Sequence, residues 1–273
     1  MFTSQGPTLR ELAVQALSSI EHGYDLLAPK FDHTPFRTPG RFLTSTADAL
    51  RPFGPFGAGL DVCCGTGAGV EALVPLCTER VTGVDFSAGM LAAAADAVPG
   101  PEARAAEGAR QGPPGPAVDW VRADARALPF DDAYDVAVSF GAFGHFLPAE
   151  RPALFAGVYR ALRPGGLFAF PVGAPQPFGS RWYWAMLGFD GAMRVRNALW
   201  RPSFVMYYRT FPLSGVRADL AAAGFDVRTQ PLEEFGRRPD GSPRWRLVVA
   251  TKPESAPKPE QDQAGRGAGA SGA

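Results

Sequence analysis

The sequence of 273 residues is poor in cysteine and histidine, with three of each, and it has no surplus of either charge. Cys63, Cys64 and Cys77 show no metal-type spacing, and vicinal cysteines at a strand end are poor disulfide partners. Because 27 basic residues balance 27 acidic ones, the charge predicts no attraction to nucleic acid or to an anionic membrane. These shortages favour a cytoplasmic protein with no metal site and no nucleic-acid partner.

Long hydrophobic runs are also missing. No apolar stretch approaches the roughly 20 residues of a membrane-spanning helix, so no membrane span is predicted. The first residues, "MFTSQGPTLRELAVQAL", lack a basic segment followed by an apolar one, which argues against a signal peptide. Apolar residues still make up 46% of the chain, enough for a sizeable core at this length.

The N-terminal part is predicted to be mostly helical. Residues 8–20 form an amphipathic pattern that begins with a capping box of Thr8 and Glu11. A shorter helix is expected over residues 44–50, and the segment between the two is aromatic and broken by proline. One helical face of the first segment is apolar and comprises Leu9, Leu12, Ala13, Ala16, Leu17 and Ile20.

From Leu60 onward, short apolar runs alternate with helical patterns, which indicates a parallel sheet covered by helices on both faces. The turn "GRRPDGSP" predicts that the last two strands form an antiparallel hairpin. Strands are expected at residues 59–64, 80–85, 118–122, 134–140, 167–172, 225–232 and 245–252. Helices are expected from the glycine turn to Pro75 and at residues 88–98, 149–162 and 213–223.

A glycine-rich turn follows the first of these strands in "LDVCCGTGAGVEALV". Alternating glycines let backbone N–H groups approach a ligand, and a helix N-terminus favours a negative group there. Asp85, at the end of the next strand, suits the two hydroxyls of a ribose. A nicotinamide dinucleotide fingerprint would need a glycine where the chain has Val70, so this class is disfavoured.

Four motifs in order carry a family resemblance: "LDVCCGTGAG", "VTGVDFSAGML", "VRADARALPFDDAYDVAVSF" and "ALRPGGLFAF". Together they resemble the class I S-adenosylmethionine-dependent methyltransferases, and within these the small-molecule branch that includes the quinone-biosynthesis enzymes. The resemblance covers residues 60–172, with a looser match through residue 252. It implies a Rossmann-like, doubly wound α/β fold whose seven-stranded sheet is mostly parallel and ends in an antiparallel hairpin.

The resemblance also implies which residues bind S-adenosylmethionine. The glycines would line the methionine and ribose side, Asp61 would fix the loop near the methionine amino group, and Asp85 would hold the ribose. The residues implied as cofactor-binding are Asp61, Gly65, Gly67, Gly69, Asp85, Phe86, Met90, Asp124, Ala125, Phe140, Gly141 and Tyr24. Of these, Phe86, Met90, Asp124 and Ala125 would surround the adenine, Phe140 and Gly141 would border the sulfonium, and Tyr24 would close over the cofactor. Asp61 and Asp124 also fit a second role as turn or cap residues.

Three parts follow from composition and resemblance. Residues 1–56 are expected to form an N-terminal helical cover, and residues 57–252 the methyltransferase core. Within the core, a substrate cover is expected at about residues 173–212, and residues 253–273 read as a disordered low-complexity tail. A Pro-, Gly- and Ala-rich loop is expected at residues 99–116.

His145 is the candidate catalytic residue, because it lies just beyond the fourth predicted strand, where cofactor and acceptor meet in this family. Methyl transfer from a sulfonium is an in-line displacement, so a base is needed only when the acceptor must lose a proton. The alternative is that His145 packs and hydrogen-bonds to organise the loop.

The acceptor is expected to be a small molecule, apolar or aromatic, methylated on oxygen, carbon or nitrogen. Its candidate contacts in the substrate cover are Trp182, Trp184, Met186 and Phe189, and the alternative is that these bury a helix against the sheet. Two other functions stay open: a nicotinamide-dependent oxidoreductase, and a binder of S-adenosylmethionine without catalysis.

Overall fold

The protein is described by a computed structural model that covers residues 6–100 and 115–254. Within these residues it has one mixed sheet of seven strands in the order β3-β2-β1-β4-β5-β7-β6, so the predicted fold class is confirmed. Strands β1 to β5 are parallel, and β7 runs antiparallel to both β5 and β6. The strands are β1 (Phe56–Val62), β2 (Cys77–Asp85), β3 (Ala117–Arg122), β4 (Tyr134–Val138), β5 (Leu162–Gly173), β6 (Asp226–Pro231) and β7 (Trp245–Thr251).

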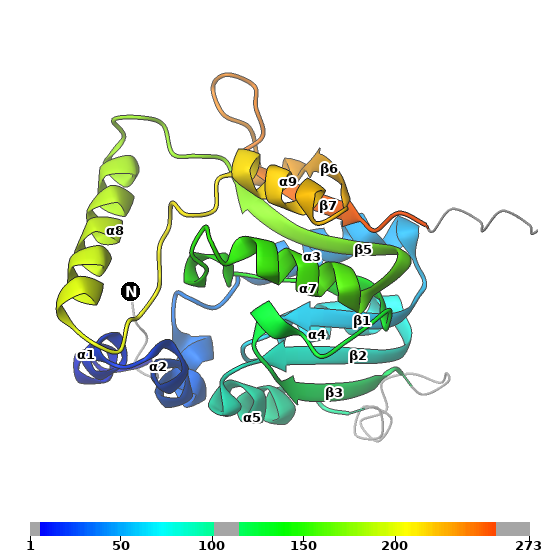
Figure 1. Ribbon diagram of the computed structural model, residues 1–273, viewed down its shortest axis with the longest axis horizontal. Coiled ribbons are helices and arrows are strands. Elements are labelled where there is room, and N and C mark those ends of the chain that lie inside the picture. The colour runs from blue at the N-terminus through cyan, green and yellow to red at the C-terminus, as the bar shows by residue number, and fades with distance from the viewer. Residues whose placement is uncertain (1–5, 101–114, 255–273) are drawn as a thin grey trace, which may run out of the picture.

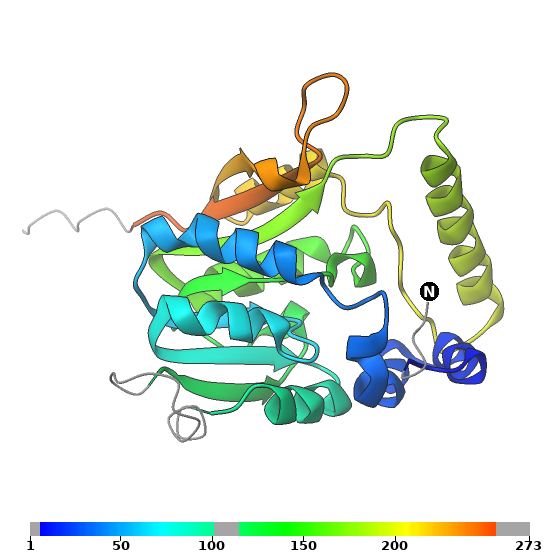
Figure 2. The same cartoon turned by 180° about the vertical axis from the view of Figure 1, so that it is seen from behind.

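Helices cover both faces of the sheet, with α7 and α9 on one face and α3, α4 and α5 on the other (Figures 1 and 2). The α-helices are α1 (Leu9–Leu17), α2 (Ile20–Leu27), α3 (Gly40–Leu50), α4 (Ala68–Leu73), α5 (Ala88–Ala97), α7 (Arg151–Ala161), α8 (Arg181–Leu199) and α9 (Leu213–Ala222). Short 3₁₀ helices are η1 (Ala28–His33), η2 (Arg51–Phe53), η3 (Val74–Leu76), η4 (Ala125–Ala127), η5 (Phe143–His145) and η6 (Glu233–Phe235).

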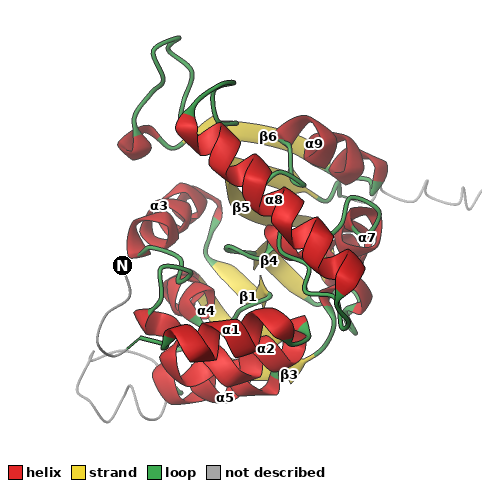
Figure 3. Ribbon diagram, turned by 90° about the vertical axis from the view of Figure 1, so that its left-hand side faces the viewer, coloured by secondary structure: helices red, strands yellow, loops and turns green. Residues whose placement is uncertain are grey.

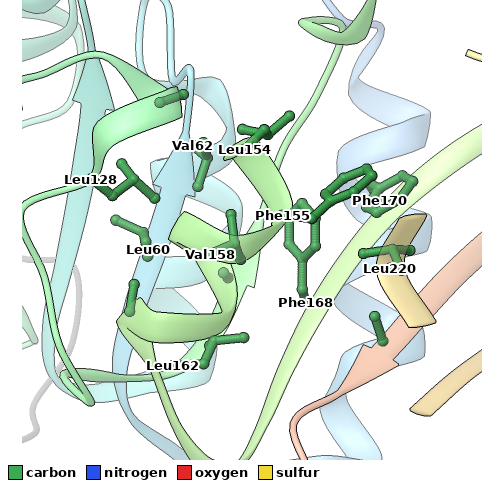
Figure 4. Packing of buried hydrophobic residues seen from close by; sticks show 14 of the residues in the cluster. Leu60, Val62, Leu128, Leu154, Phe155, Val158, Leu162, Phe168, Phe170 and Leu220 are labelled. Carbon is green, nitrogen blue, oxygen red and sulfur yellow. The ribbon is translucent and has the colours of Figure 1, made fainter. Parts of the chain in front are cut away.

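The buried side chains form one cluster on each face of the sheet, because successive side chains of a strand point to opposite sides. Leu60 and Val62 of β1 pack toward α7 with Phe168 and Phe170 of β5 (Figure 4). On strand β4, Val136 faces the other cluster, under α3 and α4. Both faces are therefore apolar, as parallel strands require.

The sequence does not predict the second helix, α2, and the helix predicted at residues 8–20 is shorter in the structure. It ends at Ser18, and the Ser19 side chain accepts a hydrogen bond from the His22 N–H at 3.2 Å, which starts α2. The serine hydroxyls compete with the continuous helical bonds, and this accounts for the break. The predicted apolar face of α1 is also not buried, since Leu9 is 84% exposed and Leu17 is 48% exposed.

Other boundaries differ by a few residues. Helix α3 begins at Gly40, four residues earlier than predicted, and β1 begins at Phe56. The motif "RPGG" lies inside β5 rather than before it, and the β4–β5 register shifts there. Helix α4 ends at Leu73, two residues before Pro75, as a proline requires. Most of the loop predicted at residues 99–116 and of the predicted tail falls outside the described residues.

Among the described helices, none is both long enough and apolar enough to cross a bilayer.

Candidate functional site

A cavity of about 1050 Å³ opens at the carboxyl ends of β1, β2, β4 and β5. This is the edge where parallel α/β sheets bind ligands, because strand ends and helix N-termini meet there. The glycine turn, the loop after β4, the helices α2 and η1, and residues 171–177 and 206–213 contribute to its wall. Helix α8 stands beyond this edge of the sheet (Figure 3), and its residues Tyr183 and Met186 line the cavity.

The turn between β1 and α4 bends sharply through left-handed backbone conformations. Gly65 and Gly67 have φ of +52° and +87°, and Cys63 has φ of +61° although it is not glycine. A side chain on Gly65 would meet no atom within 4 Å, and Gly65 lines the cavity. Gly67 does not line it: a Cβ there would lie 2.9 Å from the Trp120 ring. The structure therefore places Gly67 against Trp120 of β3 rather than in the cavity wall.

Asp61 and Gly69 meet at the base of the same turn. A Cβ on Gly69 would lie 2.3 Å from Oδ2 of Asp61, so only glycine leaves room for this carboxylate. Asp61 is 1% exposed, and its Oδ1 is buried without a hydrogen-bond partner. Burial, and then the nearby Asp85 carboxylate, hold the pKa of Asp61 well above its usual range. An acceptor atom left unpaired on a residue that lines the cavity fits a ligand that brings an N–H donor.

Asp85 is fixed by two backbone donors. Its Oδ2 accepts from the Gly65 N–H and its Oδ1 from the Ser87 N–H, each at 2.9 Å. Burial raises the pKa of Asp85, and these backbone bonds oppose the rise. Each carboxylate oxygen keeps a lone pair, so two vicinal hydroxyls can still donate to it. Phe86 and Met90 line the cavity beside it.

Asp124 caps the short helix η4 and is held by Arg126. The guanidinium Nη2 lies 2.6 Å from Oδ2 of Asp124, and Arg126 also pairs with Glu150. The Arg126 hydrogen bonds hold the pKa of Asp124 below its usual value. Asp124, Ala125 and Arg126 all line the cavity. The cavity contact of Arg126 was not predicted from the sequence.

The loop after β4 brings Phe140, Gly141 and His145 to the cavity, with Gly141 in a left-handed conformation at φ +72°. His145 Nδ1 lies 2.7 Å from the carbonyl oxygen of Val205. A carbonyl only accepts, so Nδ1 carries the proton and Nε2 is the accepting nitrogen. Nε2 lies 2.7 Å from the Tyr24 hydroxyl, which therefore donates to it. Burial lowers the pKa of His145, which keeps the ring neutral near pH 7.

Within the predicted substrate cover, α8 contributes one face to the cavity wall, in addition to residues 173–177 and 206–212. Met186 and Tyr183 line the cavity, and Asp190, one turn further, is buried. Trp182 and Trp184 are 57% and 55% exposed. The helical period of 3.6 residues turns these two away from the residues at 183, 186 and 190. Phe189 packs against Tyr208 and lies outside the cavity wall as well.

Two aspartates that were not predicted from the sequence bind the N-terminal segment to the glycine turn and to the start of α5. Asp32 accepts from the Thr66 hydroxyl at 2.7 Å. Asp25 accepts from the Ser87 hydroxyl at 2.6 Å and from the Gly89 N–H at 2.9 Å, at the N-terminus of α5. These contacts hold α2 and η1 over the end of the cavity that Asp85 lines.

Residues 60–166 match the family model described as "Methyltransferase domain". The chain carries a methyltransferase domain. The predicted resemblance to the S-adenosylmethionine-dependent class, with that cofactor, is thereby confirmed for this domain. Asp61, Gly69 and Asp85 are the residues whose geometry fits such a cofactor. No curated protein matches the methyltransferase by sequence.

Solved structures show the same fold at low identity. A SAM-dependent methyltransferase of Methanosarcina mazei shares 21% identity at a TM-score of 0.52, covering 74% of this chain and 95% of that one. Magnesium protoporphyrin IX methyltransferase of Synechocystis, with bound SAH, shares 18% identity at a TM-score of 0.51, covering 78% of this chain and 82% of that one. Human N-acetylserotonin methyltransferase, in complex with SAM, shares 15% identity at a TM-score of 0.55, covering 90% of this chain and 60% of that one.

Proposed function

We propose that the protein transfers the methyl group of S-adenosylmethionine to a small, apolar or aromatic acceptor. The observation that carries this proposal is the unpaired, buried Oδ1 of Asp61, a residue that lines the cavity together with Asp85. A cofactor with an ammonium group and two vicinal hydroxyls supplies the donors that these carboxylates lack. When bound, it supplies an electrophilic methyl group on sulfur.

The rest of the cavity wall supports an aromatic acceptor. Apart from the turn and the three aspartates, the wall is mostly aromatic and aliphatic, which favours a flat apolar ligand. The volume of about 1050 Å³ is at the upper end of the range of common ligand sites, as expected for a pocket that holds two molecules together. The aromatic and aliphatic residues of the wall include Phe143, Phe146, Tyr183, Met186, Tyr207, Tyr208 and Phe211.

We further propose His145 as the base that accepts the proton of the acceptor. Its Nε2 is an acceptor, its ring is neutral near pH 7, and it lines the cavity. The packing role considered from the sequence is compatible with this, because the Val205 carbonyl both anchors the ring and sets its tautomer. The three cysteines, all free thiols, support a reducing compartment such as the cytoplasm.

Calorimetry tests the cofactor. S-adenosylhomocysteine should bind saturably, and Asp85→Ala should weaken it by about 1–3 kcal/mol, because hydrogen bonds to a charged acceptor are lost. Asp48→Ala is the matched control, since Asp48 is exposed on α3 and pairs only with Arg51. Saturable binding of NAD(H) without binding of S-adenosylhomocysteine would contradict the proposal.

Turnover is tested with methyl-labelled S-adenosylmethionine and a panel of phenols, amines and carbon nucleophiles. Labelled product from at least one acceptor is expected. Tight binding of S-adenosylhomocysteine with no product from the whole panel would instead indicate a binder without catalysis.

A further inference from the structure

The hydroxyl of Tyr24 is hydrogen-bonded to the proposed base in the wall of the cavity. Tyr24 and His145 are 121 residues apart, yet Oη and Nε2 are 2.7 Å from each other and both residues line the cavity. Because Oη occupies the accepting direction of Nε2, an acceptor cannot hydrogen-bond to that nitrogen directly while this bond stands. The atom of the pair that remains available to an acceptor is the Tyr24 oxygen.

The pair is held in place by two other chain segments, residues 204–207 and helix α8. The Tyr24 and His145 rings meet edge to face, with centroids 5.3 Å apart, and Phe204 packs against both. The segment with Phe204 is fixed by Asn197 of α8, whose side chain bonds both the N–H and the carbonyl of Phe204. The Tyr207 N–H in turn donates to the Gly144 carbonyl at 2.8 Å. Such a frame fixes the direction of the hydrogen bond.

We infer that Tyr24 is a catalytic residue that relays the proton of a hydroxyl acceptor to His145. This inference rests on the proposed function and assigns to it oxygen as the methylated atom. The acceptor oxygen forms its new bond to the methyl carbon while the carbon–sulfur bond breaks toward sulfur. The acceptor proton passes to Tyr24 Oη, and the original Tyr24 proton passes to Nε2, which leaves an imidazolium.

The surroundings suit a residue that passes a proton on rather than one that loses it. Burial, and then the Asp85 carboxylate, raise the pKa of Tyr24, with Cys63 and Tyr208 also facing it. A phenol of raised pKa does not stay ionised, so Tyr24 gives up its proton only as it receives another. His145 itself faces Tyr24 and the Val205 carbonyl, and its lowered pKa keeps Nε2 free to accept.

The hydrogen bond is testable without any acceptor. Nitrogen NMR of the full chain labelled at the imidazoles should show His145 with its proton on Nδ1, its signals being identified by their loss in His145→Gln. Tyr24→Phe should raise the pKa of His145 by about 0.4–1.1 pH units, because the neutral ring loses one hydrogen bond. Tyr208→Phe, which removes a nearby cavity phenol that makes no hydrogen bond to His145, should leave this pKa unchanged. A proton on Nε2 in the wild type would overturn the relay.

Turnover of two phenols tests the relay itself. At about pH 8, 4-ethylphenol is protonated and 4-nitrophenol is largely ionised, so only the first needs a base. Tyr24→Phe should lower kcat about 10²–10⁴-fold with 4-ethylphenol and only a few-fold with 4-nitrophenol. Equal losses with both phenols would make Tyr24 merely structural. Methylation of an amine or carbon acceptor but of neither phenol would refute the relay while the proposed function stands.

Discussion

Substitution of Asp61 by asparagine should stabilise the free protein and weaken its binding of cofactor. The carboxylate is 1% exposed and Oδ1 has no partner, so the folded protein leaves a buried ionisable group partly unsatisfied. A buried unsatisfied group costs about 1–3 kcal/mol, and more when it is charged. Asparagine also leaves a polar atom without a partner there, but it removes the buried negative charge beside Asp85, so Asp61→Asn should raise the free energy of unfolding at about pH 7.5 by about 1–3 kcal/mol.

The stability gained by Asp61→Asn should increase as the pH rises. Because burial and Asp85 raise the pKa of Asp61 in the folded protein, the folded state binds more protons than the unfolded chain in the acid range. The contribution of Asp61 to stability is complete below its unfolded pKa and is lost as pH rises through the folded pKa. Asparagine does not titrate, so the difference between variant and wild type should grow from about pH 4.5 to pH 7.5.

Urea unfolding at both pH values and calorimetry with S-adenosylhomocysteine provide the measurements. Binding should weaken about 10- to 150-fold, because a hydrogen bond to a charged group contributes about 1.5–3 kcal/mol. Asp85→Asn is the matched control: both Asp85 oxygens accept from backbone N–H groups, so this variant should lose stability instead. No gain for Asp61→Asn, or the same gain at both pH values, would refute the assignment of Oδ1 as an unpaired acceptor.

Two further pairs of variants separate the roles within the turn. Gly67→Ala should cost about 2–4 kcal/mol of stability, since its Cβ meets Trp120 at 2.9 Å in a left-handed conformation. Gly65→Ala, with open space at its Cβ, should cost only about 1–2 kcal/mol of stability, but it should also weaken binding of S-adenosylhomocysteine. Urea unfolding measures the stability of both glycine variants, and calorimetry measures their binding. Equal stability losses for Gly65→Ala and Gly67→Ala would contradict the packing of Gly67 against Trp120. Cys63→Gly should leave thermal stability unchanged or raise it by about 1 kcal/mol, because glycine adopts φ of +61° freely. Cys64→Gly, at a buried position with ordinary backbone, should cost about 1–3 kcal/mol, and a larger loss for Cys63→Gly would exclude backbone strain there.

The core was predictable because its signals are local. Each strand is a short apolar run, and Ser87 caps α5 through its own hydroxyl, as a serine before a helical pattern predicts. The two carboxylates of the turn are also local features, one at the end of β1 and one at the end of β2. Their positions relative to the glycines are fixed by the strand–turn–helix unit itself.

The contacts between distant segments were not predictable in this way. The sequence places Tyr24 and His145 near the site but contains no signal that joins Oη to Nε2, or Nδ1 to the Val205 carbonyl. The sequence predicts the tryptophans of α8 as contacts of the acceptor. An apolar side chain next to a site, however, carries no information about which face of its helix points toward the site. Gly67 shows the same limit, since its neighbour Trp120 comes from β3, more than 50 residues later.

Helix α8 is joined to the N-terminal helices rather than to the sheet alone. The indole N–H of Trp200 donates to the Leu17 carbonyl at 3.1 Å, and Arg196 donates to the Ala16 carbonyl at 3.0 Å. Tyr24 and the segment that anchors His145 are therefore held together by contacts between the N-terminal helices and α8 with the residues that follow it. A chimera that received a new segment 173–212 alone would lose these two donors and leave the Ala16 and Leu17 carbonyls without their partners. Engineering acceptor specificity in this scaffold therefore requires exchanging residues 15–24 together with residues 173–212.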